Sequence, residues 1–381
     1  MNQFKLSFPT GKPVTGNDLV GRESVVKEII DYLKIGQSVT IIAPRRFGKT
    51  SVILEVIRQL GDYRYFTVYI DLFTTPTRRA LAERITRETL KNKKLDMVFK
   101  QVTDSISQIF KNIEFKQTVE DFDFILKFAE RNIDDFQLLE QSVEFVNSFG
   151  LKNKSATVCA FDEFGDLAKM DGNEIVKMFR ARIQHHQNTA YLFSGSYESV
   201  MNQLFIKPDS PFFRFVRVIN LDMVPEDAFK RYLINQFSNR NIPIDAGKVS
   251  DLLNFTKGHP YYTQLLAQLI ELNSIGKMKP DGNIHDLVEQ AAQLESNYVE
   301  KIWEDLKNSR EILQVAIAIV RGDDNLYTLF DNKTVNVSRA IRYLKDKGLV
   351  RKKDTAYLFT DPLVRYWIRR NVLGIDKTKC V

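Results

Sequence analysis

The sequence has little of what several classes of protein require. It holds two cysteines in 381 residues, one in a strand-like segment and one at the chain end, which make no disulfide framework. Its longest apolar stretch, Leu313 to Val320, falls well short of the roughly 20 residues that a transmembrane helix needs. The first residues lack the apolar core of a secretory signal. We therefore expect a cytoplasmic protein with no membrane partner.

Residues that perform covalent catalysis are also scarce. Four histidines and two cysteines offer no evident nucleophile with an activating base beside it. His185 and His186 fall in a predicted helix, where solvent exposure is the simpler interpretation. The same scarcity leaves no ligand cluster for a metal that depends on histidine and cysteine.

The rest of the composition is that of a globular protein. Hydrophobic residues make up 44% and charged residues 27% of the chain, and 381 residues are too many for one compact core. We expect two or three domains.

Basic residues are concentrated near the C-terminus. Residues 336–381 hold 12 Lys and Arg against 4 Asp and Glu, whereas the remaining residues hold 43 against 44. Clustered cations attract polyanions such as nucleic acid, although a solvated basic face would have the same composition.

Strand-like and helix-like segments alternate in the first part of the chain. Apolar, β-branched runs predict five strands, at 38–42, 66–72, 157–161, 190–193 and 216–221. Helical periodicity between them favours an α/β fold with a mainly parallel sheet covered on both faces. Residues 76–152 are the exception, because the segments 80–90, 122–130 and 138–149 predict a helical insertion.

Two further domains are predicted beyond residue 224. Residues 225–305 are helical throughout and form a segment that we call the lid. Residues 306–381, the C-terminal segment, have the order helix, short segment, helix, two strands around Asp354, final helix. That order is typical of a winged helix. The predicted core is therefore 1–224, followed by the lid and a winged-helix domain.

A phosphate-binding loop is predicted after the first strand. Residues 43–50 match G-x-x-x-x-G-K-[ST] except that Ala43 replaces the first glycine. Backbone N–H groups of such a loop and the following helix N-terminus attract phosphate oxygens. Lys49 would reach the β- and γ-phosphates, and Thr50 would place its hydroxyl on Mg²⁺. Ala43 is tolerable if its φ is negative.

The third predicted strand ends in two carboxylates. Asp162 and Glu163 follow an apolar run and should emerge at the carboxyl edge of the sheet, where ligands of open α/β sheets bind. We expect Asp162 to hold Mg²⁺ through its water shell and Glu163 to polarise the attacking water. Helix N-capping by Asp162 is the structural alternative. The two motifs together predict binding and hydrolysis of a nucleoside triphosphate.

The loop residues Pro44 to Thr50 resemble the PRRxGKT loop of the archaeal-type ATPase family, in the STAND branch near AAA+ ATPases. This resemblance implies an ATPase core with a helical lid and a winged helix. It also implies ATP or ADP and Mg²⁺ as ligands. Its implied nucleotide contacts are Val20, Gly21, Arg22, Pro44, Arg45, Arg46, Phe47, Gly48, Lys49, Thr50, Ser51, His259 and Pro260.

Four segments carry the resemblance beyond the loop. Val20 to Glu23 looks like the VGRE box that lies beside adenine in relatives, and Gly258 to Tyr261 resembles the GxP element of the lid. Ser194 and Ser196 are similar to the family's sensor position, where a hydroxyl can read the γ-phosphate. Arg214, in a SPLYGR-like segment with Phe213 where glycine is common, is the candidate for stabilising transition-state charge, with Arg217 as competitor.

The predicted helix at 337–347 has an apolar face and an outward face. Val337, Ala340, Ile341 and Leu344 share the first, and Arg339 and Arg342 point away from it. Together with Arg351, Lys352 and Lys353 on the wing, these arginines are candidate contacts to duplex DNA. Winged helices also serve as packing elements, so the fold alone does not establish DNA binding.

Three functions remain open at this point. The first is an ATP-driven switch that passes its state to a protein partner, with oligomerisation allowed. The second is a DNA-associated ATPase similar to origin-recognition proteins, with salt-sensitive DNA affinity. The third is a non-enzymatic interaction protein that keeps nucleotide as a structural ligand.

Overall fold

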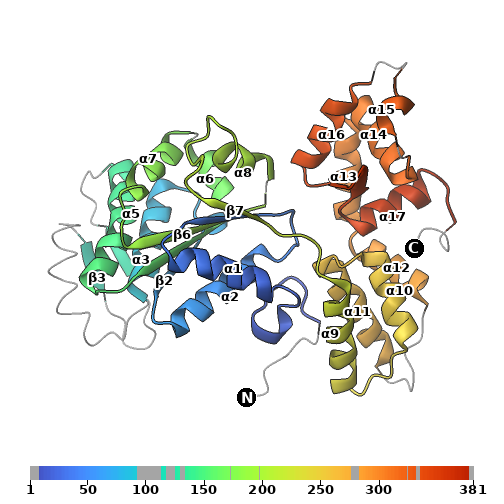
Figure 1. The fold of residues 1–381 in the computed structure, drawn as a ribbon, viewed down its shortest axis with the longest axis horizontal. Helices are drawn as coiled ribbons and strands as arrows, with labels where there is room; N and C mark the ends of the chain where they lie inside the picture. Colours follow the sequence, from blue (N-terminus) through green and yellow to red (C-terminus); the bar gives the residue numbers. More distant parts are fainter. Residues whose placement is uncertain are drawn as a thin grey trace.

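A layered α/β core comes first in the chain, and the lid and the C-terminal segment follow it (Figure 1). The computed structural model describes residues 8–91, 113–116, 125–128, 134–171, 173–196, 198–275, 283–323, 325–331 and 335–376. In this part of the chain no helix is long and apolar enough to cross a membrane.

Five parallel strands form the central sheet, in the regions that the sequence predicted. They are β1 (Val39–Ile42), β2 (Phe66–Asp71), β5 (Thr157–Asp162), β6 (Thr189–Gly195) and β7 (Arg217–Asn220). Their spatial order is β2, β5, β6, β1, β7, and every neighbouring pair is parallel. The predicted α/β fold with a parallel five-stranded sheet is confirmed. All five carboxyl ends therefore meet at one edge.

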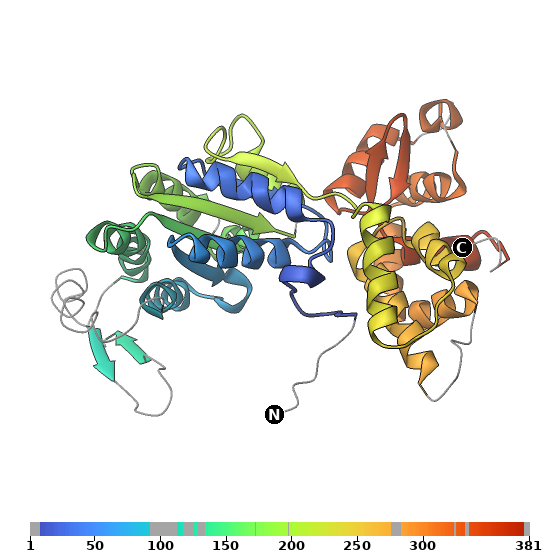
Figure 2. The same ribbon diagram turned by 60° about the horizontal axis from the view of Figure 1, so that its bottom comes forward.

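Helices cover both faces of this sheet (Figure 2). The core helices are α1 (Glu23–Lys34), α2 (Lys49–Asp62), α3 (Arg78–Lys91), α5 (Asp135–Lys152), α6 (Leu167–Asp171), α7 (Asn173–Ile183) and α8 (Glu198–Phe205). Short 3-10 turns are η1 (Gly16–Asp18), η2 (Leu72–Thr74) and η4 (Phe164–Asp166). Neighbouring strand residues face opposite sides, so Ala160 packs with α1 and α2 while Phe161 packs with α5, α7 and α8. Burial of a side chain as large as that of Phe161 contributes about 1.5–3 kcal/mol.

The predicted helical insertion is only partly helical. Residues 80–90 lie in α3 and residues 138–149 in α5, as expected. The segment 122–130 was predicted as a helix, and this was wrong, because β4 (Ile125–Phe128) within it pairs antiparallel with β3 (Ile113–Lys116). The sequence IEFK of β3 alternates apolar and charged residues with the period of a strand. That alternation is the signal that the helical interpretation overlooked.

Within residues 225–275 and 283–305, the regular elements of the lid are all helices, as predicted. Its helices are α9 (Glu226–Asn239), α10 (Ala246–Thr256), α11 (Pro260–Ser274), α12 (Ile284–Leu294) and α13 (Ser296–Lys307). Pro225 is the N-cap of α9, and the acidic Glu226 and Asp227 form its first turn, where the helix dipole favours negative charge.

The C-terminal segment has the predicted order of elements. They are α14 (Arg310–Arg321), α15 (Leu326–Leu329), α16 (Val337–Asp346), β8 (Val350–Lys353), β9 (Ala356–Phe359) and α17 (Pro362–Asn371). The two strands pair antiparallel across a turn at Asp354, whose φ is 53°. In α16 the four predicted apolar residues are all buried, whereas Arg339 and Arg342 are exposed. The amphipathic interpretation of this helix is confirmed.

The lid and the C-terminal segment share one hydrophobic core. The ring of Phe255 in α10 contacts that of Tyr366 in α17 at 6.2 Å between centroids, and Trp303 in α13 contacts Trp367 at 5.3 Å. In both views these two segments lie beyond β7, on one side of the core (Figure 1, Figure 2). Because one hydrophobic core spans both segments, the predicted domain boundary between residues 305 and 306 stays a prediction.

Candidate active site

The predicted phosphate loop connects β1 to α2 at the carboxyl edge of the sheet. Gly48, the N-cap of α2, has a φ of 84°, a left-handed conformation that favours glycine. Ala43 does not have a positive φ, so its methyl group does not strain the loop. Arg46 has a φ of 68°, which costs a non-glycine residue about 1–2 kcal/mol. Strain of this kind persists only where surrounding contacts fix the backbone.

Lys49 opens α2 and is buried within the loop. Its Nζ donates to the carbonyl oxygens of Ala43 and Pro44, both at 2.9 Å. Burial lowers the pKa of Lys49 to about 8, although Glu163, Asp162 and Glu198 act to raise it. The ammonium group therefore lies at the carboxyl edge, held by bonds to the loop backbone that an incoming anion could replace.

Asp162 accepts hydrogen bonds from four groups. Thr50 Oγ1 donates to its Oδ2 at 2.6 Å and the Tyr69 hydroxyl to the same oxygen at 3.2 Å. Its Oδ1 accepts from the Ser194 hydroxyl and from the backbone N–H of Glu163. Burial, with Asp162 and Asp71 nearby, raises the pKa of Tyr69, so this phenol stays a donor. Asp162 does not cap the turn that follows it.

Glu163 is held by Ser196 at the end of the neighbouring strand. Ser196 donates its hydroxyl to Glu163 Oε1 and its backbone N–H to Oε2, the latter at 2.9 Å. The backbone of Glu163 has a φ of 53°, again left-handed for a non-glycine residue. The half-buried carboxylate is thus fixed in orientation by a strained backbone and a serine.

The register of the sheet explains why these residues meet. β6 lies between β1 and β5, with Ser194 opposite Ile41 and Phe193 opposite Phe161. The ends of the three strands consequently bring the loop, both carboxylates and both serines to one edge. The structure brings together Lys49, Thr50, Asp162, Glu163, Ser194 and Ser196.

The segment before α1 reaches the loop and the lid. Arg22 is buried and donates to the carbonyl oxygens of Asp222, at 2.6 Å, and Phe47, at 3.4 Å. Burial lowers the pKa of Arg22 to about 10, and Asp222 opposes this shift. A Cβ at Gly21 would lie 2.8 Å from Val224 Cγ1, so glycine permits this close approach. The backbone of Val20 to Arg22 thus packs against the start of the lid.

The predicted lid element also lies at the loop. His259 is buried, and its ring contacts those of Phe47 and Tyr262 at 4.9 and 4.7 Å between centroids. Burial, with Arg46, Arg22 and Arg351 nearby, lowers the pKa of His259 to about 3, so its ring is neutral near pH 7. Pro260 is the first residue of α11, where proline suits a helix.

Arg46 joins the loop to the lid through contacts that sequence reasoning missed. Its guanidinium donates to Glu295 at 2.7 Å and to the Tyr262 hydroxyl at 3.3 Å. It also lies over the rings of Tyr261 and Tyr298, at 4.3 and 4.4 Å from their centroids.

The Arg46 contacts continue into the C-terminal segment. Tyr262 donates to Asp361 at 2.5 Å, and Asp361 in turn caps α17. The tyrosines that contact Arg46 lie before and after α12 in the sequence, at Tyr261, Tyr262 and Tyr298. Their spacing gives no sign that they pack on the loop.

Three of the predicted nucleotide contacts, Pro44, Arg45 and Ser51, lie in the loop or at the start of α2. The Ser51 hydroxyl accepts from the backbone N–H of Val14 at 3.0 Å. Arg45 is exposed, next to the half-buried Pro44.

The structure does not bring Arg214 to the carboxyl edge. It precedes β7, whose first residue, Arg217, pairs with Val39, the first residue of β1. Arg214 and Arg217 therefore lie at the amino edge, one strand length from Lys49. Arg214 is exposed and lies over the ring of Phe213 at 5.2 Å, and Arg217 lies over Tyr32. Within one chain, neither arginine reaches the candidate site.

The candidate DNA contacts have mixed surroundings. Arg339 and Arg342 on α16 and Lys352 and Lys353 on β8 are exposed. Arg351 forms an ion pair with Asp222, which belongs to the connection between core and lid.

Comparisons with known proteins support the same architecture. No family model and no curated protein matches the sequence. The Walker-type ATPase PABY2304 of Pyrococcus abyssi is similar in structure, with a TM-score of 0.66 and 16% identity over 97% of this chain and 100% of that chain. The ORC2 protein of Aeropyrum pernix, in its ADPNP–ADP complexes, has a TM-score of 0.53 and 12% identity over 97% of this chain and 98% of that chain. Its ADP form has a TM-score of 0.50 and 13% identity over 98% of both chains. At these identities the similarity concerns the fold, and the chain has the fold of P-loop ATPases.

Proposed function

We propose that this protein binds and hydrolyses ATP with Mg²⁺ and works as a nucleotide-dependent switch of the STAND type, in the archaeal-type ATPase family. The observation that carries the proposal is the meeting of Lys49, Thr50, Asp162 and Glu163 at one sheet edge. A helix N-terminus with a buried lysine attracts phosphate, and two carboxylates beside it suit hydrolysis.

The residues at this edge fit a magnesium ion and a triphosphate. The Thr50 hydroxyl and the Asp162 carboxylate, 2.6 Å apart, are oxygen ligands of the kind that Mg²⁺ prefers. Bound there, the ion would neutralise charge on the phosphate oxygens. Lys49 would exchange its bonds to the loop carbonyls for phosphate oxygens. The neutral ring of His259 and the Val20–Arg22 segment would lie beside the rest of the nucleotide.

Glu163 is the proposed general base. To accept a proton from water, its carboxylate must give up at least one of its bonds to Ser196. Ser196 therefore competes with water for this carboxylate until the site rearranges, whereas the Ser194 hydroxyl orients Asp162. This arrangement is consistent with slow turnover by the isolated chain.

Arg46 is the proposed connection between the nucleotide and the rest of the molecule. It belongs to the loop, yet its contacts are in the lid, and Tyr262 extends them to Asp361. A change of loop conformation on hydrolysis would alter these contacts, which is how a local event biases a domain arrangement. The state of the lid and C-terminal segment would then be presented to a protein partner.

A second candidate is a DNA-associated ATPase similar to origin-recognition proteins. The exposed Arg339, Arg342, Lys352 and Lys353 support it, because a recognition helix and a wing with outward cations suit a duplex. The ion pair of Arg351 with Asp222 speaks for an internal packing role instead. This candidate predicts DNA affinity that falls steeply with salt.

Steady-state ATP hydrolysis by the wild type beside Glu163→Gln tests the proposal. We expect Glu163→Gln to lower kcat by about 100-fold or more, since general bases contribute about 10²–10⁴. Asp166→Asn is a matched control, because it removes a carboxylate three residues away that pairs with Lys169 at the surface. Equal losses in both variants, or none in Glu163→Gln, would contradict the assignment. Stimulation of the wild type by duplex DNA at low salt would favour the second candidate.

A further inference from the structure

A cavity of about 460 Å³ lies where the lid meets the C-terminal segment, and no residue of the phosphate loop lines it. Its walls come from the connection after β7, the turn between α10 and α11, the end of α14, the two strands β8 and β9, and α17. This volume is in the range of sites that bind small molecules. The cavity is therefore formed jointly by the connection after β7, the lid and the C-terminal segment.

Cations dominate the walls of this cavity. Six basic residues line it, against the single carboxylate of Glu226: Lys257, Arg321, Arg351, Lys353, Arg365 and Arg369. Arg351 pairs with Asp222 and Arg321 with Asp323, and Arg365 and Arg369 also have partners within the chain. Four come from the basic region of 336–381, whose charge the phosphate site does not use. So many cations around one hollow favour an anionic ligand.

Apolar residues form part of the same walls. Leu253, Phe255, Ile319 and Phe359 line the cavity, and Phe255 and Phe359 are only 7% and 8% exposed. A concave apolar wall with cations around it suits a small molecule that has both a phosphate and an apolar, planar body. A DNA backbone is a convex, polar surface and would instead contact exposed cations across the wing.

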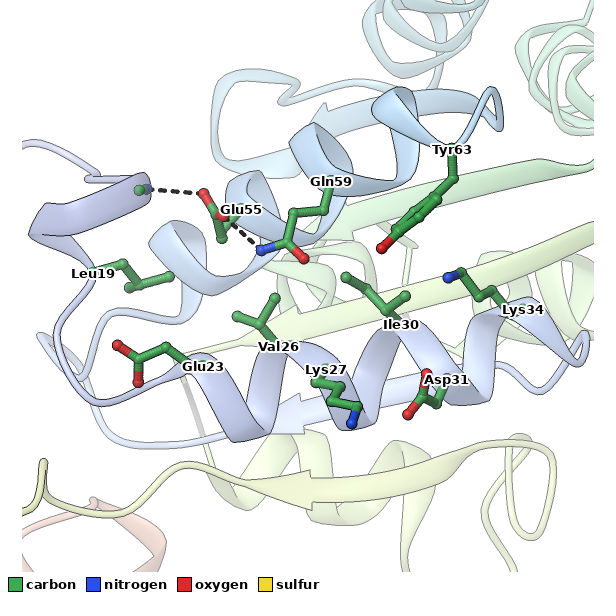
Figure 3. Close-up of a pocket in the computed structure, with 11 residues that line it drawn as sticks. Leu19, Glu23, Val26, Lys27, Ile30, Asp31, Lys34, Glu55, Gln59 and Tyr63 are labelled. Carbon is green, nitrogen blue, oxygen red and sulfur yellow. Dashed lines mark hydrogen bonds between the residues drawn. The ribbon is translucent and has the colours of Figure 1, made fainter.

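A second pocket has a different balance of charge. It lies between α1 and α2 and has a volume of about 470 Å³ (Figure 3). Glu23, Asp31 and Glu55 line it together with Lys27 and Lys34, so neither sign of ligand is favoured. Glu55 already accepts from the Gly16 N–H and from Gln59.

We propose that the cavity between the lid and the C-terminal segment is a second ligand site, which binds a small organic phosphate with an aromatic or other planar body. Such a ligand would contact the connection to the core, the lid and the C-terminal segment at once.

Pyridoxal 5′-phosphate is a suitable probe, because it carries a phosphate and a planar ring. Its aldehyde carbon condenses with a lysine amine, water leaves, and borohydride then delivers a hydride to the imine carbon to give a stable secondary amine. Peptide mass spectrometry reports modification lysine by lysine, so that labelling at Lys49 is read separately. Lys353 lines the cavity. Its neighbour Lys352 is also exposed but does not line the cavity, which makes Lys352 an internal control.

We expect half-maximal modification of Lys353 at about tenfold lower probe concentration than Lys352, the effect of one or two charge-assisted contacts to the phosphate. Arg365→Gln and Arg321→Gln, which keep both lysines, should each reduce this preference, and inorganic pyrophosphate should protect Lys353 selectively. Equal modification of the two lysines, or a preference unchanged in both arginine variants, would overturn the proposal. Protection of both lysines by duplex DNA but not by pyrophosphate would also overturn it, in favour of a polyanion surface.

Discussion

At the scale of single residues, the proposed chemistry depends on Lys49, Thr50, Asp162 and Glu163, which lie together at one edge of the sheet. The spacing from Ala43 to Thr50 and the carboxylates after an apolar run were sufficient to predict Lys49, Thr50, Asp162 and Glu163. Tyr69 was missed, because its contact with Asp162 depends on the pairing of β2 with β5. Arg214 was proposed from the resemblance, although its position before the strand at 216–221 already indicated the amino edge of the sheet.

The low pKa of Lys49 predicts a pH-dependent affinity for ATP. Burial lowers this pKa to about 8 without nucleotide, whereas a bound triphosphate favours the charged form. The lysine is charged below pH 8 and loses its proton above it, so affinity should fall as pH rises from about 7 to 9. Calorimetric titrations across this range should show up to about a tenfold loss per pH unit at the upper end. Lys49→Ala should bind ATP weakly at every pH, without a fall in affinity between about pH 7 and 9. The same fall in this variant would contradict the role of Lys49.

At the scale of elements, helices and buried strands were predictable because their periodicity is local. The apolar face of α16 was derived residue by residue, and burial of Val337, Ala340, Ile341 and Leu344 confirms it. The ribbon of β3 and β4 was not predicted, since two strands of four residues give only a short pattern. Contacts between elements, such as that of Arg46 with Glu295, lie 249 residues apart in sequence and leave no local signal.

The ion pair of Arg46 with Glu295 predicts a measurable coupling between the loop and the lid. Its side chains are 29% and 10% exposed, and the guanidinium also lies over two tyrosine rings. In a double-mutant cycle with Arg46→Ala and Glu295→Gln, we expect a coupling of about 1–2 kcal/mol in the free energy of unfolding. The exposed pair of Arg58 with Asp62, at 3.3 Å, is the control and should give less than about 0.5 kcal/mol. Similar values for both pairs would show that the Arg46 contact does not join the two parts.

At the scale of the whole molecule, the order of the segments followed from the sequence, but their association did not. A helical lid and a winged-helix order could be read from periodicity and turns. That the two share one core depends on side chains such as Phe255 and Tyr366, which are 111 positions apart and are individually ordinary apolar residues. Each element depends on contacts between residues close in sequence and was therefore predictable. The packing of the lid against the C-terminal segment depends on distant residues and was not.

The shared core predicts that the lid and the C-terminal segment open together. Phe255→Ala should remove a buried ring and cost about 3–5 kcal/mol. In native-state hydrogen exchange we expect this variant to lose protection in α9–α11 and also in α14 and α17. Phe145→Ala, which empties a comparable buried site in the α/β core, should instead lower protection in α3 and α5. If Phe255→Ala lost protection only in the lid, the lid and the C-terminal segment would not open as one cooperative unit.

The most direct test of the central claim is the identity of the nucleotide that the protein retains. Wild type, Glu163→Gln and Lys49→Ala are each incubated with ATP and Mg²⁺ and separated rapidly from free nucleotide, and the bound nucleotide is quantified. A hydrolysing switch predicts ADP on the wild type, ATP on Glu163→Gln and little of either on Lys49→Ala. Retention of unhydrolysed ATP by the wild type, or equal retention by Lys49→Ala, would contradict the account.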